Sequence, residues 1–206
     1  MTSGLRERRK QEARRAIADA ATALFMANGF DDVTIVQVAD VAGVSKMTVT
    51  NYFPRKEDLV FDRAEVIIRS LADVVSARAP GESLLAAIRR DFDERIAAND
   101  IRFSLHPAFA TMVRNSPVLI NRQREIADLI EQALGDAIAE ETGVDDTQQR
   151  IVAAQLASVH RVLQVEGAKF AIGGQAREEI RQQLTHAAHR AFDLLEPAIG
   201  DYGVRS

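Results

Sequence analysis

The sequence predicts an all-α fold of about nine helices, with a helix-turn-helix domain over residues 1–56 and a larger helical domain over residues 57–206. Apolar residues recur at helical spacing along most of the chain, and no segment has a convincing strand pattern. Each of the five prolines stands where a helix could begin, end or bend. The predicted helices cover residues 6–28, 35–42, 45–52, 56–78, 82–98, 100–114, 117–141, 146–171 and 175–195.

Two segments show the helical spacing most clearly. Between residues 17 and 25, apolar side chains recur at i, i+3, i+4, i+7 and i+8, and Gly29 then supplies the left-handed conformation that commonly ends a helix. Toward the C-terminus the same spacing runs from Ile180 to Leu195. Each segment therefore predicts an amphipathic helix with one face in a core.

Composition narrows the classes of protein that the chain can be. With 206 residues, 47% of them hydrophobic and 27% charged, it is typical of a globular protein. The absence of cysteine excludes disulfides, thiolate chemistry and cysteine-based zinc sites. No run approaches the ~18 apolar residues of a membrane span, and the N-terminus lacks the apolar region of a secretory signal. We therefore expect a cytoplasmic protein with no membrane partner.

The charge is unevenly distributed along the chain. The net charge is −4, but residues 1–56 carry nine Lys and Arg against six Asp and Glu, a net +3, which leaves −7 for the rest. Such an asymmetry suggests a segment that binds a polyanion, joined to an ordinary acidic domain. The alternative is that the basic residues of the first helix only form a solvated face.

Capping signals predict two short helices with a turn between them. Thr34 and Gln37 form the S/T-x-x-E/Q pattern of a capping box, and Gly43 provides the positive φ that ends the helix. Ser45 is placed to cap the next helix, so Gly43, Val44 and Ser45 form the turn. The TVT run that follows favours a strand locally, but the caps and the following proline outweigh that weak preference. The arrangement predicts a helix-turn-helix.

The polar residues of the second short helix predict a double-stranded DNA partner. A major groove admits such a helix, whose exposed side chains then meet base edges. Hydroxyl groups near helix N-termini, a phenol and ammonium groups can contact phosphates. The expected base contacts are Lys46, Met47, Thr50 and Asn51; the expected phosphate contacts are Thr34, Thr48, Tyr52 and Lys56; and the expected basic arm is Arg6, Arg8, Arg9, Lys10, Arg14 and Arg15. Thr34 as a cap only and Tyr52 as a core-rim residue only are the alternatives.

The run TIVQVADVAGVSKMTVTNYFPRKEDL resembles the DNA-binding domain of the TetR family of transcriptional regulators. The resemblance covers about residues 10–62. Thr50 departs from the family pattern, which often has an aromatic residue there, and Met47 stands where Gly, Pro or Arg is frequent. The operator sequence therefore cannot be taken from a relative. Arg55 also replaces the usual small capping residue, a change that would weaken that cap and add a phosphate contact. The matching residues are Thr34, Val38, Ala39, Ala42, Gly43, Val44, Ser45, Thr48, Tyr52, Phe53, Lys56, Glu57 and Leu59.

The resemblance implies a homodimer that binds a pseudo-palindromic operator, a ligand pocket inside the larger domain, and repression relieved by a small-molecule effector of unknown identity. It also implies that the last two helices pair with those of a second copy as a four-helix bundle. A small-residue face on the last helix would allow that close approach. The expected interface residues are Leu184, Ala187, Ala188 and Ala191. The alternative is that these helices only close the core of one chain.

A pocket could be lined by the apolar and aromatic side chains of the middle helices. Pro107 is expected to break or bend the sixth helix, at a place where a ligand could act. The expected lining residues are Phe92, Phe103, His106, Phe109, Met112, Leu156, Val159, His160 and Leu163, with ordinary core packing as the alternative for each.

An enzyme is the main rival class, and the sequence offers little for it. There is no Gly-rich phosphate loop, nucleophile elbow or H-E-x-x-H motif, and no cofactor is predicted. His186 and His189, with Glu178 or Glu196, are a weak metal signal, and surface or interface roles are the more frequent use of such histidines. A third possibility is an interaction module without sequence-specific DNA binding, but the polar second helix and the basic arm argue against it.

Overall fold

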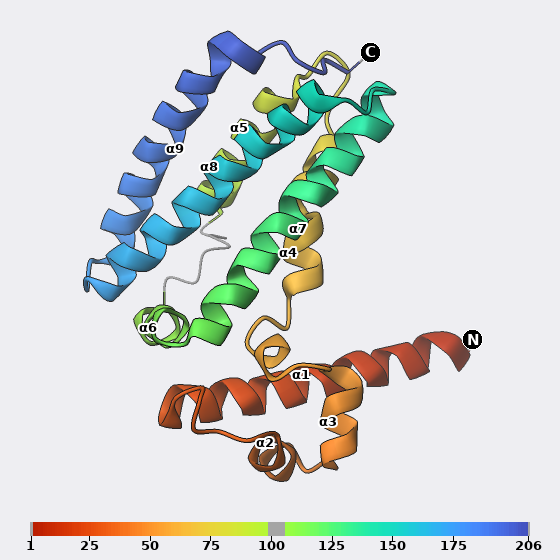
Figure 1. Ribbon diagram of the computed structural model, residues 1–206, viewed down its shortest axis with the longest axis vertical. Coiled ribbons are helices and arrows are strands. Elements are labelled where there is room, and N and C mark those ends of the chain that lie inside the picture. Colours follow the sequence, from red (N-terminus) through yellow and green to blue (C-terminus); the bar gives the residue numbers. More distant parts are fainter. Residues whose placement is uncertain (1, 99–105, 206) are drawn as a thin grey trace. The chain divides into compact units, whose positions relative to one another are not determined.

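The computed structural model describes residues 2–98 and 106–205, with side chains described from residue 8 on, and every regular element in these ranges is helical (Figure 1). The all-α prediction is therefore confirmed over these ranges. The helices are α1 (Thr2–Asn28), α2 (Ile35–Ala42), α3 (Lys46–Tyr52), the short 3₁₀ helix η1 (Lys56–Leu59), α4 (Ala64–Ser76), α5 (Leu84–Ala97), α6 (Pro107–Asn115), α7 (Pro117–Thr142), α8 (Thr147–Ile172) and α9 (Arg177–Ile199).

The chain divides into two compact units. The N-terminal unit consists of residues up to Glu65 together with Met112–Arg122, and the C-terminal unit consists of the other described residues. None of the helices in the described ranges is long and apolar enough to cross a membrane.

In the N-terminal unit, α1 supports the two short helices. Its inward stripe includes Ile17, Ala21 and Phe25, all fully buried, and α2 and η1 both pack against it. Val38 of α2 and Val49 of α3 complete the small core. Burial of this stripe follows from the i, i+4, i+8 spacing of the three α1 residues.

Lys56 closes the C-terminal end of α1. Gly29 leaves the helix with φ 88°, and the next two carbonyls, of Phe30 and Asp31, accept hydrogen bonds from Lys56 Nζ at 2.5 and 3.3 Å. The ammonium also lies 4.3 Å from the centroid of the Phe30 ring, a cation–π distance. Burial lowers the pKa of Lys56, because desolvation outweighs the nearby carboxylates.

Three predicted helix boundaries are wrong. The helix predicted over 56–78 is interrupted between η1 and α4, where the carbonyl of Asp62 accepts a hydrogen bond from Arg14 Nη2 at 3.0 Å instead of an intrahelical one. His106 is not helical and Pro107 begins α6, where a missing N–H costs nothing, so this proline breaks the predicted sixth helix and does not bend it. Helix α9 does not stop before Pro197; it continues to Ile199, which is buried.

The C-terminal unit is a helical bundle. In Figure 1, α8 and α9 run side by side, and both α5 and α8 pack against α9. The fully buried side chains Leu84, Leu134, Leu156 and Leu184 come from four different helices, α5, α7, α8 and α9. The bundle therefore has one shared apolar core.

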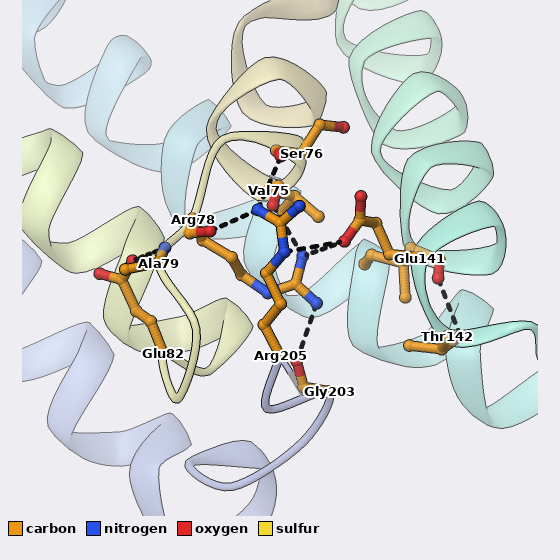
Figure 2. A network of polar contacts seen from close by, with 10 residues as sticks. Val75, Ser76, Arg78, Ala79, Glu82, Glu141, Thr142, Gly203 and Arg205 are labelled. Atoms are coloured by element: carbon orange, nitrogen blue, oxygen red, sulfur yellow. Dashed lines mark hydrogen bonds and ion pairs between the residues drawn. The ribbon is translucent and has the colours of Figure 1, made fainter.

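A buried arginine ties the end of α4 to the chain that follows α9 (Figure 2). Arg78 is 2% exposed; its Nη1 donates to the carbonyl of Val75 at 2.7 Å and lies 3.2 Å from Glu141 Oε2. Its Nη2 donates to the carbonyl of Gly203 at 3.0 Å. Arg205 completes the network, since its Nη1 donates to the carbonyl of Ser76 at 3.1 Å. We call Arg78, Glu141, Gly203 and Arg205 the C-terminal latch.

The latch requires glycine at position 203. Its φ of 63° is one that side chains disfavour, and a Cβ there would stand 2.9 Å from Leu84 Cδ1. The backbone on both sides of the latch is also paired: Gly81 N–H donates to the carbonyl of Arg205 at 2.8 Å, and Arg205 N–H donates to the carbonyl of Glu82 at 3.2 Å.

Replacing Lys56 by methionine is expected to destabilise the N-terminal unit by about 1–3 kcal/mol, because the carbonyls of Phe30 and Asp31 lose a charged donor. The measurement is the free energy of unfolding in urea. Lys46→Met is the matched control, because Lys46 is an exposed lysine of the same unit. Equal effects of the two substitutions would contradict the capping role of Lys56.

Replacing Arg78 by methionine is expected to lower the free energy of unfolding by about 3 kcal/mol, since Glu141 and the carbonyls of Val75 and Gly203 would lose their partner. Arg69→Met is the control, because that arginine lies on the exposed side of α4, 3.6 Å from Asp73. Thermal and urea unfolding of both variants should separate them. A loss of stability no larger than that of the control would show that the latch contributes little.

Candidate nucleic-acid interface

The helix-turn-helix is built by the caps that the sequence indicates. The hydroxyl of Thr34 accepts a hydrogen bond from the Gln37 N–H at 3.3 Å, and the Gln37 Oε1 accepts one from the Thr34 N–H at 2.7 Å. Gly43 adopts φ 67°, and the N–H of Val44 donates to the carbonyl of Ala39 at 3.0 Å. These bonds form the capping box and the helix end from which the chain turns into α3.

Helix α3 has a capped N-terminus and an exposed outer face formed by Lys46, Met47 and Asn51. Ser45 Oγ accepts from the Thr48 N–H at 3.0 Å and so caps its N-terminus. Among its own seven residues only Val49 is fully buried. The exposed side chains on its outer face are therefore available to a partner.

The four residues expected to contact bases lie on this accessible helix. Lys46 and Asn51 are exposed, and the side chain of Met47 stands out at 68% exposure. Thr50 is half-buried, and its hydroxyl donates to the carbonyl of Met47 at 3.1 Å. This bond occupies the hydroxyl hydrogen within the helix, so Thr50 offers a groove its methyl group and an oxygen acceptor.

The four residues expected to contact phosphates have structural partners as well. Thr34 serves the capping box, Thr48 Oγ1 lies 2.9 Å from Ser45 Oγ, and Lys56 holds the end of α1. Tyr52, the last residue of α3, is half-buried. Contact of any of these residues with phosphate stays a prediction.

The basic arm contains residues of two kinds. Arg8, Arg9 and Lys10 are exposed, and the side chain of Arg15 is 84% exposed. The side chain of Arg6 lies outside the described residues. Arg14 instead points into the unit, and its position three and seven residues before Ile17 and Ala21 is the signal that could have placed it on the buried stripe.

Arg14 links α1 to the far end of α3. Its Nη1 donates to the carbonyl of Tyr52 at 2.8 Å, and its Nη2 donates to the carbonyl of Asp62. The guanidinium carbon lies 4.4 Å from the centroid of the Phe53 ring. Burial raises the pKa of the Asp62 carboxyl, with Arg14 opposing that shift.

Two further contacts were missed by the sequence analysis because they join distant parts of the chain. Ser116 Oγ donates to Asp31 Oδ1 at 3.2 Å, and Arg122 Nη2 lies 2.9 Å from Asp58 Oδ1. Both partners of the Arg122 pair are mostly buried. The junction of α6 and α7 is thereby held within the N-terminal unit.

The residues expected to line a pocket differ in burial. Leu156, Val159 and Leu163 of α8 are buried, and Phe92 meets Phe192 edge-on at 6.1 Å between ring centroids. Phe109, Met112 and His160 are half-buried, and His106 is exposed. Phe103 lies outside the described residues. Met112 belongs to the N-terminal unit, and the other described residues of the set belong to the C-terminal unit.

The residues expected at a dimer interface fall on two sides of α9. Leu184 and Ala188 are fully buried in the core of the single chain, whereas Ala187 is exposed and Ala191 half-buried. The nearby His189 Nε2 lies 2.7 Å from Asp93 Oδ1. The described ranges contain no group of three or more His, Asp or Glu residues that could hold a metal ion.

Comparison with known proteins agrees with this geometry. Residues 17–62 match the family described as bacterial regulatory proteins, tetR family. The transcriptional regulator TcmR of Streptomyces glaucescens is 27% identical over 172 residues, which cover 79% of this chain and 76% of TcmR.

Two solved structures share the fold. A TetR-family regulator from Streptomyces coelicolor superposes with a TM-score of 0.52 at 21% identity, covering 89% of this chain and 96% of that one. The regulator FadR of Bacillus subtilis, solved in complex with stearoyl-CoA, superposes with a TM-score of 0.51 at 18% identity, covering 88% and 96%. The capped helix-turn-helix of residues 17–62 is therefore a DNA-binding domain of the tetR family, and the chain is a DNA-binding transcriptional regulator, not an enzyme.

Proposed function

We propose that this regulator represses transcription by binding a pseudo-palindromic operator as a homodimer, with one α3 helix in the major groove of each half-site, and that a small molecule bound in the C-terminal unit releases it. The observation that carries the proposal is the outer face of the capped helix α3, where Lys46, Met47 and Asn51 are exposed. Such a helix fits a groove about 12 Å wide. We place its action in the cytoplasm, where bacterial DNA lies.

Specific reading of bases is assigned to four side chains of α3. Lys46 can donate to guanine O6 and N7, and Asn51 can pair with adenine N6 and N7. Met47 and the methyl group of Thr50 offer apolar contact to a thymine methyl group. The exposed arm residues Arg8, Arg9 and Arg15 would add phosphate contacts that carry no sequence information.

The dimer interface is assigned to the outward sides of α8 and α9. Ile151, Val162 and Val165 of α8 are large apolar residues with substantial exposure, and Leu194 of α9 is 80% exposed. Exposed apolar side chains on two long neighbouring helices fit a surface that a second copy covers. Ala187 and Ala191 belong to this surface, whereas Leu184 and Ala188 stabilise the single chain.

An effector site is assigned to the interior of the C-terminal unit. Ser70 of α4 is buried with no hydrogen-bond partner for its hydroxyl, and the buried Gln155 Oε1 of α8 also has none. Unpaired buried polar groups cost free energy, so a ligand that satisfies them gains affinity. That the same fold holds stearoyl-CoA in B. subtilis FadR supports a small-molecule site of this general kind. Release then follows as a population shift toward a dimer that no longer fits DNA.

Selection of bound duplexes from a random pool is expected to enrich a palindrome for the wild-type protein. Lys46→Ala and Asn51→Ala should relax specificity at defined positions in each half-site, at about 1–3 kcal/mol per lost base contact. The readout is sequencing of the bound fraction. Enrichment of a non-palindromic site, or none at low salt, would contradict the proposal.

Leu194→Glu is expected to dissociate the dimer, because it places two symmetry-related carboxylates in an apolar interface. Leu129→Glu on α7 is the control, since Leu129 is also exposed but lies on neither α8 nor α9. Sedimentation measures the mass of each variant, and a shift assay measures its affinity for the selected duplex. A dimeric Leu194→Glu variant would place the interface elsewhere.

A further inference from the structure

We propose that Arg14 is a positioning residue for DNA recognition, because it sets the orientation in which α3 presents its side chains to the groove. The inference rests on the proposed role of α3 as the reading helix. This role does not require Arg14 to contact DNA. The residue acts through the backbone at the end of α3.

Three contacts fix the guanidinium. It donates to the carbonyl of Tyr52 at 2.8 Å and to the carbonyl of Asp62 at 3.0 Å. It also stacks over the ring of Phe53, with 4.4 Å from the guanidinium carbon to the ring centroid. A planar guanidinium can donate through both terminal nitrogens and stack at the same time, which an ammonium cannot. The side chain thus joins α1, the end of α3 and the segment before α4.

Helix α3 depends on such a link because little else holds its C-terminal end. A seven-residue helix is marginal by itself, since so short a segment makes few intrahelical bonds. Its N-terminal end is fixed by the Ser45 cap and the turn from α2. At the other end only Phe53 is buried, and the carbonyl of Tyr52 is one of those that a helix terminus leaves unpaired.

The orientation of α3 affects the preference for one DNA sequence more than it affects the affinity for DNA of any sequence. Hydrogen bonds to base edges weaken steeply when donors and acceptors are misaligned. Phosphate contacts by flexible, exposed arginines tolerate a displaced helix, because they depend mainly on charge. Loss of the Arg14 contacts should therefore reduce the preference for the operator over other DNA.

The neighbouring arginine provides a matched control. Arg15 has the same charge and lies one residue away, but its side chain is 84% exposed and its nearest acidic group, Asp19, is 3.9 Å distant. Arg15→Ala removes one positive charge from the same helix without touching α3. Any difference between Arg14→Ala and Arg15→Ala then reports the contacts of Arg14 and not its charge.

The experiment compares two duplexes, the one selected by the wild-type protein and a scrambled duplex of the same composition. The specificity ratio is the dissociation constant for the scrambled duplex divided by that for the selected duplex. Arg15→Ala is expected to weaken binding to both duplexes and to leave this ratio unchanged. Arg14→Ala is expected to lower that ratio about tenfold, comparable to losing one base contact. Arg14→Lys should restore part of the ratio, because an ammonium can still donate to the two carbonyls.

Hydrogen exchange provides a second readout. In Arg14→Ala the amides of α3 and of Phe53 should exchange faster than in Arg15→Ala, while those in the middle of α1 stay protected. If Arg14→Ala does not fold, Arg14→Gln carries the same comparison, since its amide reaches one carbonyl at most.

An unchanged ratio and unchanged α3 exchange in the Arg14 variants would overturn the inference. Failure of the proposed function looks different. In that case the wild-type protein itself enriches no sequence, and no ratio can be defined for any variant.

Discussion

Two cations bound to backbone carbonyls hold the N-terminal unit together, and the rest of the DNA-binding surface depends on them. Lys56 donates hydrogen bonds to the carbonyls that follow α1, and Arg14 donates to the carbonyls at the end of α3 and before α4. The carbonyl of Tyr52 is one that a helix end leaves unpaired, and the other three lie in the segments between helices, of which a unit made of short helices has many. A charged donor satisfies them more strongly than a neutral one.

The side chains on the outer face of α3 therefore contribute little to the stability of the N-terminal unit. Val49 and Phe53 are buried, and the N-terminal cap uses Ser45. Lys46, Met47 and Asn51 make no contribution to the core. Because Lys56 and Arg14 hold the N-terminal unit through backbone atoms, the side chains at those positions can differ between relatives without changing the fold of the unit. A common fold is thus compatible with many operators.

The parts of the structure that could be predicted are those with local signals. Thr34, Gln37 and Gly43 define α2 within a few residues, and the structure has its boundaries at the predicted positions. The contacts of Arg14 could not be predicted in this way, because their partners lie 38 and 48 residues further along the chain. An arginine in a basic run also resembles its exposed neighbours.

The small residues of α9 show a different limit. Leu184 and Ala188 share the spacing of an apolar stripe, and spacing alone does not tell whether the stripe faces the chain's own core or a second copy. Both side chains are fully buried in the single chain, so this stripe faces the chain's own core. The candidate interface therefore moves to Ala187, Ala191 and Leu194, which lie further around the helix.

The C-terminal latch has a mechanical consequence. Val75 and Ser76 end α4, which leads out of the N-terminal unit, whereas Gly203 and Arg205 follow α9. The latch makes these two ends one stiff joint, because moving them apart would break the hydrogen bonds from Arg78 to the carbonyl of Gly203 and from Arg205 to the carbonyl of Ser76 (Figure 2). A displacement of the chain that follows α9 is therefore expected to move the C-terminal end of α4 with it.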